Sequence, residues 1–352
     1  MPKRVGYVYE EVISRDNCIK AVREMARSKP KHRRAQYMKE HAEEFGEVLH
    51  KQLSTDTWKP KPYRTKTIVD GFRMKERHLK IPCLWDQCVH HAVVQVLAPY
   101  IERRNYFYNC GSMPGAGQIR ATRAMRRWMA SKKILRYGMS LDIEHFFENC
   151  RAEVVMKALA RIFKDKKFLA LNRKILASMG DSLAIGFTLS HWYGNLVLMY
   201  IDFEIKQRIL PGCKYVRYMD DMVLLFNNKR QLHRARLVIE KLLDERGLKL
   251  KHNWQVYKIA GRGVTFLSYR FFHGYTIMRK RLMYRISRKA KKVRQSRKMT
   301  PHNAASVMSY LGILKQCNCH HFKKKYWYPY VNVKKCKGVV RNEMRRIRQN
   351  AA

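Results

Sequence analysis

The chain has 352 residues, of which 46% are hydrophobic, so it is long enough for two or three compact units and is not a disordered tail. No stretch reaches the roughly 18 apolar residues of a membrane span, and the N-terminus lacks the apolar core of a signal peptide. The nine cysteines are scattered. Without an export signal they predict reduced thiols in a cytoplasmic protein.

Charge is the dominant bulk feature. The formal net charge is +47, and residues 246–352 hold 28 Lys and Arg but a single acid, Glu343. A surface of this kind needs a polyanion, and nucleic acid is the default partner. An anionic membrane is the alternative, but the chain offers no amphipathic anchor with a Trp and Leu face. We therefore expect a nucleic-acid partner and no membrane.

The first third of the chain predicts helices around one extended segment. Residues 14–53 are expected to be helical, with Ser14 or Asp16 as a cap and a break at SKPKHRR. The following stretches predict an extended segment (TWKPKPYRTKTIV), a helix (WDQCVHHAVVQVLAPYIERR), a loop (CGSMPGAG) and a helix over Gln118–Ser131. This last helix places four arginines mostly on one face: Arg120, Arg123, Arg126 and Arg127.

The middle of the chain alternates strands with helices. ILRYGMSLDI predicts a strand, residues 151–180 two helices, and LSHWYGNLVLMYIDFEIKQRI one long helix. A hairpin (KYVRYMDDMVLLF), a helix over residues 229–246 and two strands (WQVYKIA and VTFLSYRFF) follow. After residue 276 the chain is basic and predicted to be helical. This order favours a mixed, largely antiparallel sheet packed on helices, an α+β fold.

Three aspartates stand in apolar surroundings. Asp220 and Asp221 interrupt the hairpin KYVRYMDDMVLLF, and Asp142 ends a predicted strand in YGMSLDIEHFFENC. Burying unpaired charges is costly, so neighbouring carboxylates call for a cation. Mg²⁺ binds one or two carboxylates together with substrate phosphates, and two such ions serve phosphoryl transfer. The alternative is a strand-end cap and an ordinary turn, but the turn lacks Gly, Asn or Pro.

These motifs resemble the reverse transcriptases. Tyr218-Met219-Asp220-Asp221 matches their catalytic tetrapeptide, LDIEHFFENC resembles their first catalytic motif, and GFTLSHWYGN resembles the next palm motif, with Gly186, Ser190 and Asn195 matching. FLSYRFF resembles the strand pair behind the primer, CGSMPGAGQIRA the fingers loop, and SYLGILKQCNCHHFKKKYW the thumb. The resemblance covers residues 60–328. It is most similar to the enzymes of diversity-generating retroelements and group II introns in bacteria and phages.

The resemblance implies a right-hand polymerase with fingers, palm and thumb. It assigns residues 1–135 to N-terminal helices and fingers, 136–275 to the palm with a helical insertion at 151–185, and 276–352 to a basic helical thumb. Two Mg²⁺ ions are implied at Asp142, Asp220 and Asp221, with Ile143 beside them. The implied nucleotide-binding residues are Arg77, Gly117, Arg120, Phe147, Gly186, Ser190, His191 and Lys249.

Individual roles follow from the same resemblance. Phe147 is implied as the ring that excludes a 2′-OH, although it could instead belong to the core. Phe146 would point to the opposite face if this stretch were a strand. Arg77 is implied to approach the triphosphate, with a solvated charged turn as the alternative. Gly117 would let main-chain N–H groups approach phosphate. Lys249 corresponds to a lysine that protonates pyrophosphate.

The chain departs from the family at three places. His191 replaces a Gln that supports the templating base, and its imidazole has a different reach. Ala116 replaces an Arg of the fingers loop, for which Arg120 is a substitute one helical turn away. Gln87 stands where the family has a basic side chain. These changes put ordinary processive synthesis in doubt, but they remove no implied metal ligand.

The C-terminal part has its own features. Residues 279–298 carry 11 Lys or Arg and no acid, with interleaved apolar residues, which predicts a helix against RNA or a template–primer duplex rather than a disordered basic tail. CNCHH (317–321) has metal-ligand residue types, but Cys-x-Cys is tighter than usual zinc spacing. We therefore do not expect zinc.

The sequence as a whole predicts an RNA-directed DNA polymerase that makes cDNA from an RNA template with dNTPs, for a retroelement such as a diversity-generating one. A small accessory protein is a further expected partner. A defence-type bacterial reverse transcriptase, an RNA-dependent RNA polymerase and a non-catalytic RNA-binding protein with a polymerase fold are the alternatives. Three costly carboxylates argue against the non-catalytic one, and Phe147 and Met219 favour DNA over RNA synthesis.

Overall fold

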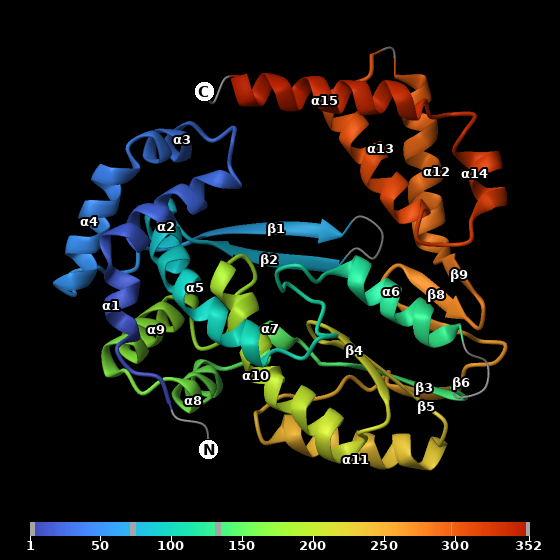
Figure 1. Cartoon of the computed structure of the whole chain (residues 1–352), viewed down its shortest axis with the longest axis horizontal. Helices are drawn as coiled ribbons and strands as arrows, with labels where there is room; N and C mark the ends of the chain where they lie inside the picture. The colour runs from blue at the N-terminus through green and yellow to red at the C-terminus, as the bar shows by residue number, and fades with distance from the viewer. Residues whose placement is uncertain (1–3, 71–74, 131–134, 297, 350–352) are drawn as a thin grey trace. The chain divides into compact units, whose positions relative to one another are not determined.

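The computed structural model describes residues 4–70, 75–130, 135–296 and 298–349 (Figure 1). The chain forms two compact units: residues 1–117, 140–222 and 230–255 make the first, and residues 118–139, 223–229 and 256–352 the second. Each unit draws on separated segments, so the three-part division at residues 135 and 275 stays a prediction. Ser131 and Arg297, the first a predicted helix end and the second part of the basic stretch, lie outside the described residues.

The first unit begins with four helices: α1 (Val8–Ile13), α2 (Arg15–Arg27), α3 (Arg33–Glu40) and α4 (Ala42–Ser54). The predicted cap at Ser14 is confirmed, because its side chain accepts a hydrogen bond from the Asn17 N–H at 3.4 Å. The sequence did not predict α1. This helix is only six residues long and its N-cap makes no side-chain hydrogen bond, so it carries no start signal.

A hairpin and a long helix follow: β1 (Arg64–Asp70), β2 (Lys75–Ile81) and α5 (Leu84–Arg104). The two strands are antiparallel, with Arg64 opposite Ile81 at the base. A buried carboxylate, Asp86, ties the preceding segment to α5. It accepts hydrogen bonds from the Trp58 indole at 3.2 Å and from the Lys61 main chain at 2.9 Å.

The predicted helices in the middle of the chain are confirmed as α8 (Ala152–Ile162), α9 (Lys166–Met179), α10 (Thr188–Glu204) with its π-helical end η1 (Ile205–Ile209), and α11 (Lys229–Asp244). The short helix α7 (Phe146–Asn149) was not predicted. Helix α10 packs against α5 and α8 within the first unit, and its residues from Trp192 to Leu198 are all buried. A helix covered on most sides is expected to be largely apolar, and the buried polar residues of this one, Asn195 and Asp202 among them, have hydrogen-bond partners.

The central sheet has four strands in the order β4-β5-β3-β6. They are β3 (Tyr137–Asp142), β4 (Lys214–Tyr218), β5 (Asp221–Phe226) and β6 (Gln255–Lys258). The predicted hairpin is confirmed as β4 and β5, separated by Met219 and Asp220 alone. Residues 222–225 of β5 are buried in succession. Both faces of this strand are therefore covered, which explains its uninterrupted apolar run.

The second unit contains α6 (Gln118–Met129) and a three-stranded antiparallel sheet of β7 (Val264–Phe266), β8 (Tyr269–Phe272) and β9 (Tyr275–Met278). The single strand predicted for VTFLSYRFF is wrong, because the chain turns at Leu267 and Ser268. The strand β9 lies partly in a region predicted to be helical. Leu267 adopts a φ of 52° without any Gly, Asn or Pro to mark the turn, so this stretch carries no local turn signal.

Four helices complete the second unit: α12 (Lys280–Gln295), α13 (Pro301–Leu314), α14 (His320–Tyr326) and α15 (Val333–Gln349). Helix α12 buries Ile286, Ala290 and Val293, spaced four and three residues apart on one face. The alternative of a disordered basic tail is therefore wrong for its described residues. Helix α13 packs against α12 and α15, as Figure 1 shows.

Among the described residues, none of the helices combines the length and the apolar character that crossing a membrane requires.

The contact between α2 and α4 predicts the effect of one substitution. A Cβ at Gly46 would lie 2.4 Å from Ile19 Cγ1 and 2.8 Å from its Cα, and the main chain of α2 cannot move aside cheaply. We expect Gly46→Ala to lower the free energy of unfolding by about 1–3 kcal/mol, measured by urea denaturation. The control is Gly312→Ala in α13, where the new Cβ meets nothing within 4 Å. That change should stabilise by about 0.5–1 kcal/mol. Equal effects at the two glycines would contradict the close approach.

Candidate active site

The turn between β4 and β5 carries the two adjacent aspartates. Met219 has a φ of 54°, a left-handed conformation that costs a non-glycine residue about 1–2 kcal/mol. Two neighbours hold it there. The Arg217 guanidinium donates to the Met219 carbonyl at 3.0 Å, and Gly111 lies so close that a Cβ there would be 2.3 Å from the Met219 nitrogen. The strained turn is thus fixed by residues outside it.

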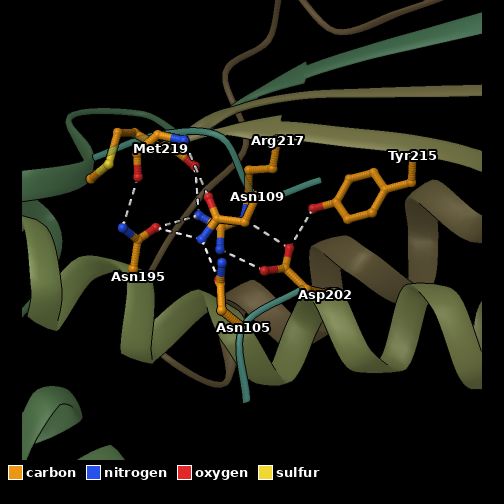
Figure 2. A network of polar contacts seen from close by, with 8 residues as sticks. Asn105, Asn109, Asn195, Asp202, Tyr215, Arg217 and Met219 are labelled. Carbon is orange, nitrogen blue, oxygen red and sulfur yellow. Dashed lines mark hydrogen bonds and ion pairs between the residues drawn. The ribbon is translucent and has the colours of Figure 1, made fainter. Parts of the chain in front are cut away.

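Arg217 and Asp202 form a buried ion pair next to this turn. Arg217 of β4 donates from Nε to Asp202 Oδ1 at 2.8 Å and from Nη2 to Asp202 Oδ2 at 2.5 Å (Figure 2). Their side chains are 0% and 1% exposed. Tyr215 donates a further hydrogen bond to Asp202 at 2.7 Å. Burial works to lower the pKa of Arg217, but the charge and hydrogen bonds of Asp202 more than offset it and raise that pKa. Arg217 therefore stays ionised.

Asparagine side chains extend this network to a neighbouring loop. Asn195 of α10 accepts hydrogen bonds from Asn109 at 2.9 Å and from Arg217 at 3.1 Å, and donates to the Gly111 carbonyl at 2.9 Å (Figure 2). The loop also bonds the main chain of β4, since the Cys110 N–H donates to the Arg217 carbonyl at 2.8 Å. Asn195, which the sequence named only as a motif match, thus joins α10, the loop and β4.

The structure brings two of the three predicted carboxylates together. Asp142 is the last residue of β3, and Asp220 lies in the β4–β5 turn. Burial raises the pKa of Asp220, and the negative charge of Asp142 and a hydrogen bond with its carboxyl raise it further. Lys251 acts in the opposite direction. It forms an ion pair with Asp142 through its ammonium, while its main-chain N–H donates to the Asp142 carbonyl at 2.8 Å.

The other two predicted metal-binding residues, Asp221 and Ile143, are next to Asp220 and Asp142 in the sequence. Asp221 begins β5 and is half-buried, with interactions of its own. Ile143 is fully buried, so only its main-chain carbonyl could serve a metal. Within the described ranges, no group of three or more His, Cys, Asp and Glu side chains converges as a metal-binding set. The four-residue metal set therefore stays a prediction.

The pair of Asp142 and Asp220 nevertheless fits a divalent ion. Their mutual repulsion raises the pKa of Asp220, and a cation, here the Lys251 ammonium, already lies on Asp142. Magnesium requires only one or two protein carboxylates when substrate phosphates supply the other oxygens. Asp142 and Asp220 are the residues that would hold such an ion.

Phe147 follows Asp142 by five positions in the sequence, and its ring faces His191. The stretch is the short helix α7 rather than a strand, so the expected alternation of Phe146 and Phe147 does not apply. Phe146 is buried, and a Cβ at Gly194 would come within 2.9 Å of its ring. Phe147 is half-buried, with its ring centroid 5.5 Å from that of His191 at an angle of 85°. Burial lowers the pKa of His191, which favours its neutral form.

Gly186 and Ser190, two of the predicted nucleotide-binding residues, each contact another segment of the chain. Gly186 has a φ of 114°, and a Cβ there would lie 2.3 Å from the Lys80 carbonyl oxygen of β2. Ser190 is buried, and its hydroxyl donates to Met179 Sδ at 3.5 Å. Their nucleotide-binding role stays a prediction.

Four other predicted residues lie on different elements. Arg77 is exposed on β2 opposite Ile68, and Gly117, with a φ of 96°, immediately precedes α6. Arg120 lies in α6 of the second unit and is half-buried with a partner. Lys249 is exposed, and its carbonyl accepts from the Glu144 N–H at 2.8 Å. Their roles also stay predictions.

Sequence reasoning missed three charged residues of this site: Arg217, Asp202 and Lys251. The first two carried a readable signal, because Arg217 and Asp202 each follow directly on apolar residues of a strand or helix, the same kind of signal that singled out Asp220. Lys251 carried none among so many basic residues. The departure at Gln87 has a local explanation, since its side chain donates to the Pro82 carbonyl at 2.8 Å at the start of α5.

Comparison with known proteins identifies the family. The model of the reverse transcriptase (RNA-dependent DNA polymerase) family matches residues 65–271, more than half of the chain. The chain belongs to the reverse transcriptase family. Protein YkfC of Escherichia coli (strain K12) is similar to it, with 23% identity over 68% of this chain and 72% of YkfC.

Solved structures show the same right-hand polymerase fold. The telomerase of Candida tropicalis in complex with a fragment of telomeric RNA matches 86% of this chain with a TM-score of 0.52 and 12% identity. The corresponding complex of Candida albicans matches 84% with a TM-score of 0.50 and 10% identity. The chain spans 57% and 55% of these telomerases. The predicted α+β fold of a reverse transcriptase is confirmed.

The buried ion pair leads to a double-mutant prediction. Arg217→Met or Asp202→Asn alone leaves one charged partner buried without its counter-charge, and we expect each to cost about 3–5 kcal/mol of unfolding free energy. Replacing both, as Arg217→Met with Asp202→Asn, should cost clearly less than the sum of the two. Urea unfolding of the wild type and the three variants measures the coupling. Additive losses would contradict the pairing.

Proposed function

We propose that this reverse transcriptase is an active RNA-directed DNA polymerase that makes cDNA from an RNA template. The observation that supports this most strongly is the pairing of Asp142 and Asp220, which raises the pKa of Asp220, at a turn that buried residues hold in a strained shape. A protein without catalytic work has no evident reason to retain two facing carboxylates and the strain.

The chain's own residues divide the work. Asp142 and Asp220 supply negative charge for divalent ions, with Asp221 and the Ile143 carbonyl as further candidates. When bound, two Mg²⁺ ions would activate the attacking 3′-oxygen and stabilise the leaving pyrophosphate. Arg217, through the Met219 carbonyl, orients the turn that carries Asp220. Phe147 and His191, whose rings contact each other, would contact the sugar and base of a dNTP.

The expected partners follow from charge and from the relatives. A net charge of +47 suits an RNA template and a template–primer duplex, and the telomerase structures that resemble this chain contain RNA. The basic helix α12 has an apolar side that packs and a charged side that remains for a phosphate backbone. We propose a retroelement, such as a diversity-generating one, as the setting, with a small accessory protein. A cytoplasmic location stays a prediction.

The decisive experiment is primer extension on an RNA template with dNTPs and Mg²⁺. Asp220→Asn with Asp221→Asn should lower the extension rate by about 10²–10³-fold or more, because the charge that stabilises the reacting groups is removed. The control is Asp244→Asn, the same chemical change at an exposed residue of α11, which should leave the rate unchanged. If the wild type binds RNA tightly but extends no primer, the proposal is wrong and the chain is a non-catalytic RNA-binding protein.

A second experiment tests the proposed role of Phe147. Removing its ring in Phe147→Ala should raise rNTP relative to dNTP incorporation by about 10–200-fold, the usual effect of one apolar contact on selectivity. Phe147→Tyr keeps the ring and should keep the preference for dNTPs. Single-nucleotide incorporation rates with each substrate give the ratio. An unchanged ratio in Phe147→Ala would show that the ring is only part of the core.

A further inference from the structure

A groove in the first unit lies between α3, α4 and the base of the β1–β2 hairpin, and we call it the N-terminal groove. Its cavity volume is about 820 Å³. His32, Arg34, Lys61 and Arg64 line it together with the rings of Phe45 and Trp85. Most of its lining precedes residue 65, where the match to the family begins. The polymerase site shares no residue with this groove, so the proposed activity does not account for it.

The N-terminal groove is positively charged. Arg34, Lys61 and Arg64 are exposed, and in the part of the chain that the structure describes none of their side chains forms an ion pair. No carboxylate belongs to the described lining. Of the three acids of α4, Glu47 pairs with Arg15 of α2 at 2.7 Å and Glu43 pairs with Arg23, while Glu44 is exposed and is not part of the lining. The groove therefore keeps its positive charge for an anionic ligand.

Two aromatic rings give the groove a second property. The centroids of Phe45 and Trp85 are 6.2 Å apart at an angle of 60°, and both side chains are half-buried. The indole N–H of Trp85 donates to Gln52 Oε1 at 2.9 Å. The polar edge of the ring is thus satisfied within the protein, and its exposed part is an apolar face. Bases of any sequence stack on such rings.

We propose that the N-terminal groove binds an unpaired segment of RNA, with bases on Phe45 and Trp85 and phosphates at Arg34, Lys61 and Arg64. Positive charge along a groove with aromatic rings is the combination that binds single strands. An acidic peptide would use the charges but would not need the rings. Bound there, an RNA is held by the enzyme independently of the polymerase site, so this inference does not depend on catalysis.

The test measures binding of a fluorescein-labelled decauridylate by anisotropy at several salt concentrations. The variant is Arg34→Ala/Lys61→Ala/Arg64→Ala. Its control is Lys20→Ala/Arg173→Ala/Lys241→Ala, which removes the same charge from exposed positions of the first unit outside the groove. Losing three phosphate contacts should lower the slope of log K against log salt by about 2, at about 0.7 for each contact on a single strand. The control should keep the wild-type slope.

A ring variant and a cross-link complete the test. Phe45→Leu should weaken decauridylate binding by about 5- to 150-fold, the range expected for one lost base stack. A decamer containing 4-thiouridine should cross-link to Phe45 or Trp85, and mass spectrometry locates the site. The proposal is overturned if both triple variants change the slope equally, or if cross-links occur only outside the groove. It is also overturned if poly-L-glutamate competes as well as RNA and Phe45→Leu binds normally, which would indicate an acidic protein.

Discussion

The buried ion pair of Arg217 and Asp202 is the interaction on which the polymerase site depends. A guanidinium without access to water is stable only when its counter-charge and hydrogen-bond acceptors surround it. Here the acceptors come from α10 and from the carbonyl of Met219, so satisfying one buried cation fixes the strand, the helix and the turn together. The position of Asp220 follows from this arrangement. The strain at Met219 is tolerated because the same contacts make any relaxed turn more costly.

The fold was largely predictable because most elements carry a local signal. Caps, apolar periodicity and the uninterrupted run of β5 located the helices and the central hairpin. The failures have a common cause. Helix α1 has no capping side chain, and the turn at Leu267 uses a left-handed leucine instead of glycine. Where tertiary contacts enforce a conformation that the residue itself disfavours, pattern arguments from one sequence give the wrong boundary.

The sequence predicted the acidic residues of the site but not which side chains contact one another there. Apolar surroundings singled out Asp142 and Asp220 from 27 acidic residues. Lys249 was predicted from family resemblance, but the lysine that pairs with Asp142 is Lys251. Which of the two contacts Asp142 depends on the strand position that faces β3. Residue spacing alone does not contain this information. Ser190 shows the converse. Its motif match predicts a nucleotide-binding role, whereas the structure shows its hydroxyl donating to the sulfur of Met179.

The contact between Gly111 and Met219 links two segments that are more than a hundred residues apart in the chain. The space between them has no room for even one methyl group, since a Cβ on Gly111 would overlap the nitrogen of Met219. The loop over residues 108–111 and the turn over residues 218–221 can therefore change only together. The two segments are therefore one structural unit, although they come from distant parts of the chain. A chimera that takes the turn from one relative and the loop from another would join incompatible halves of one site.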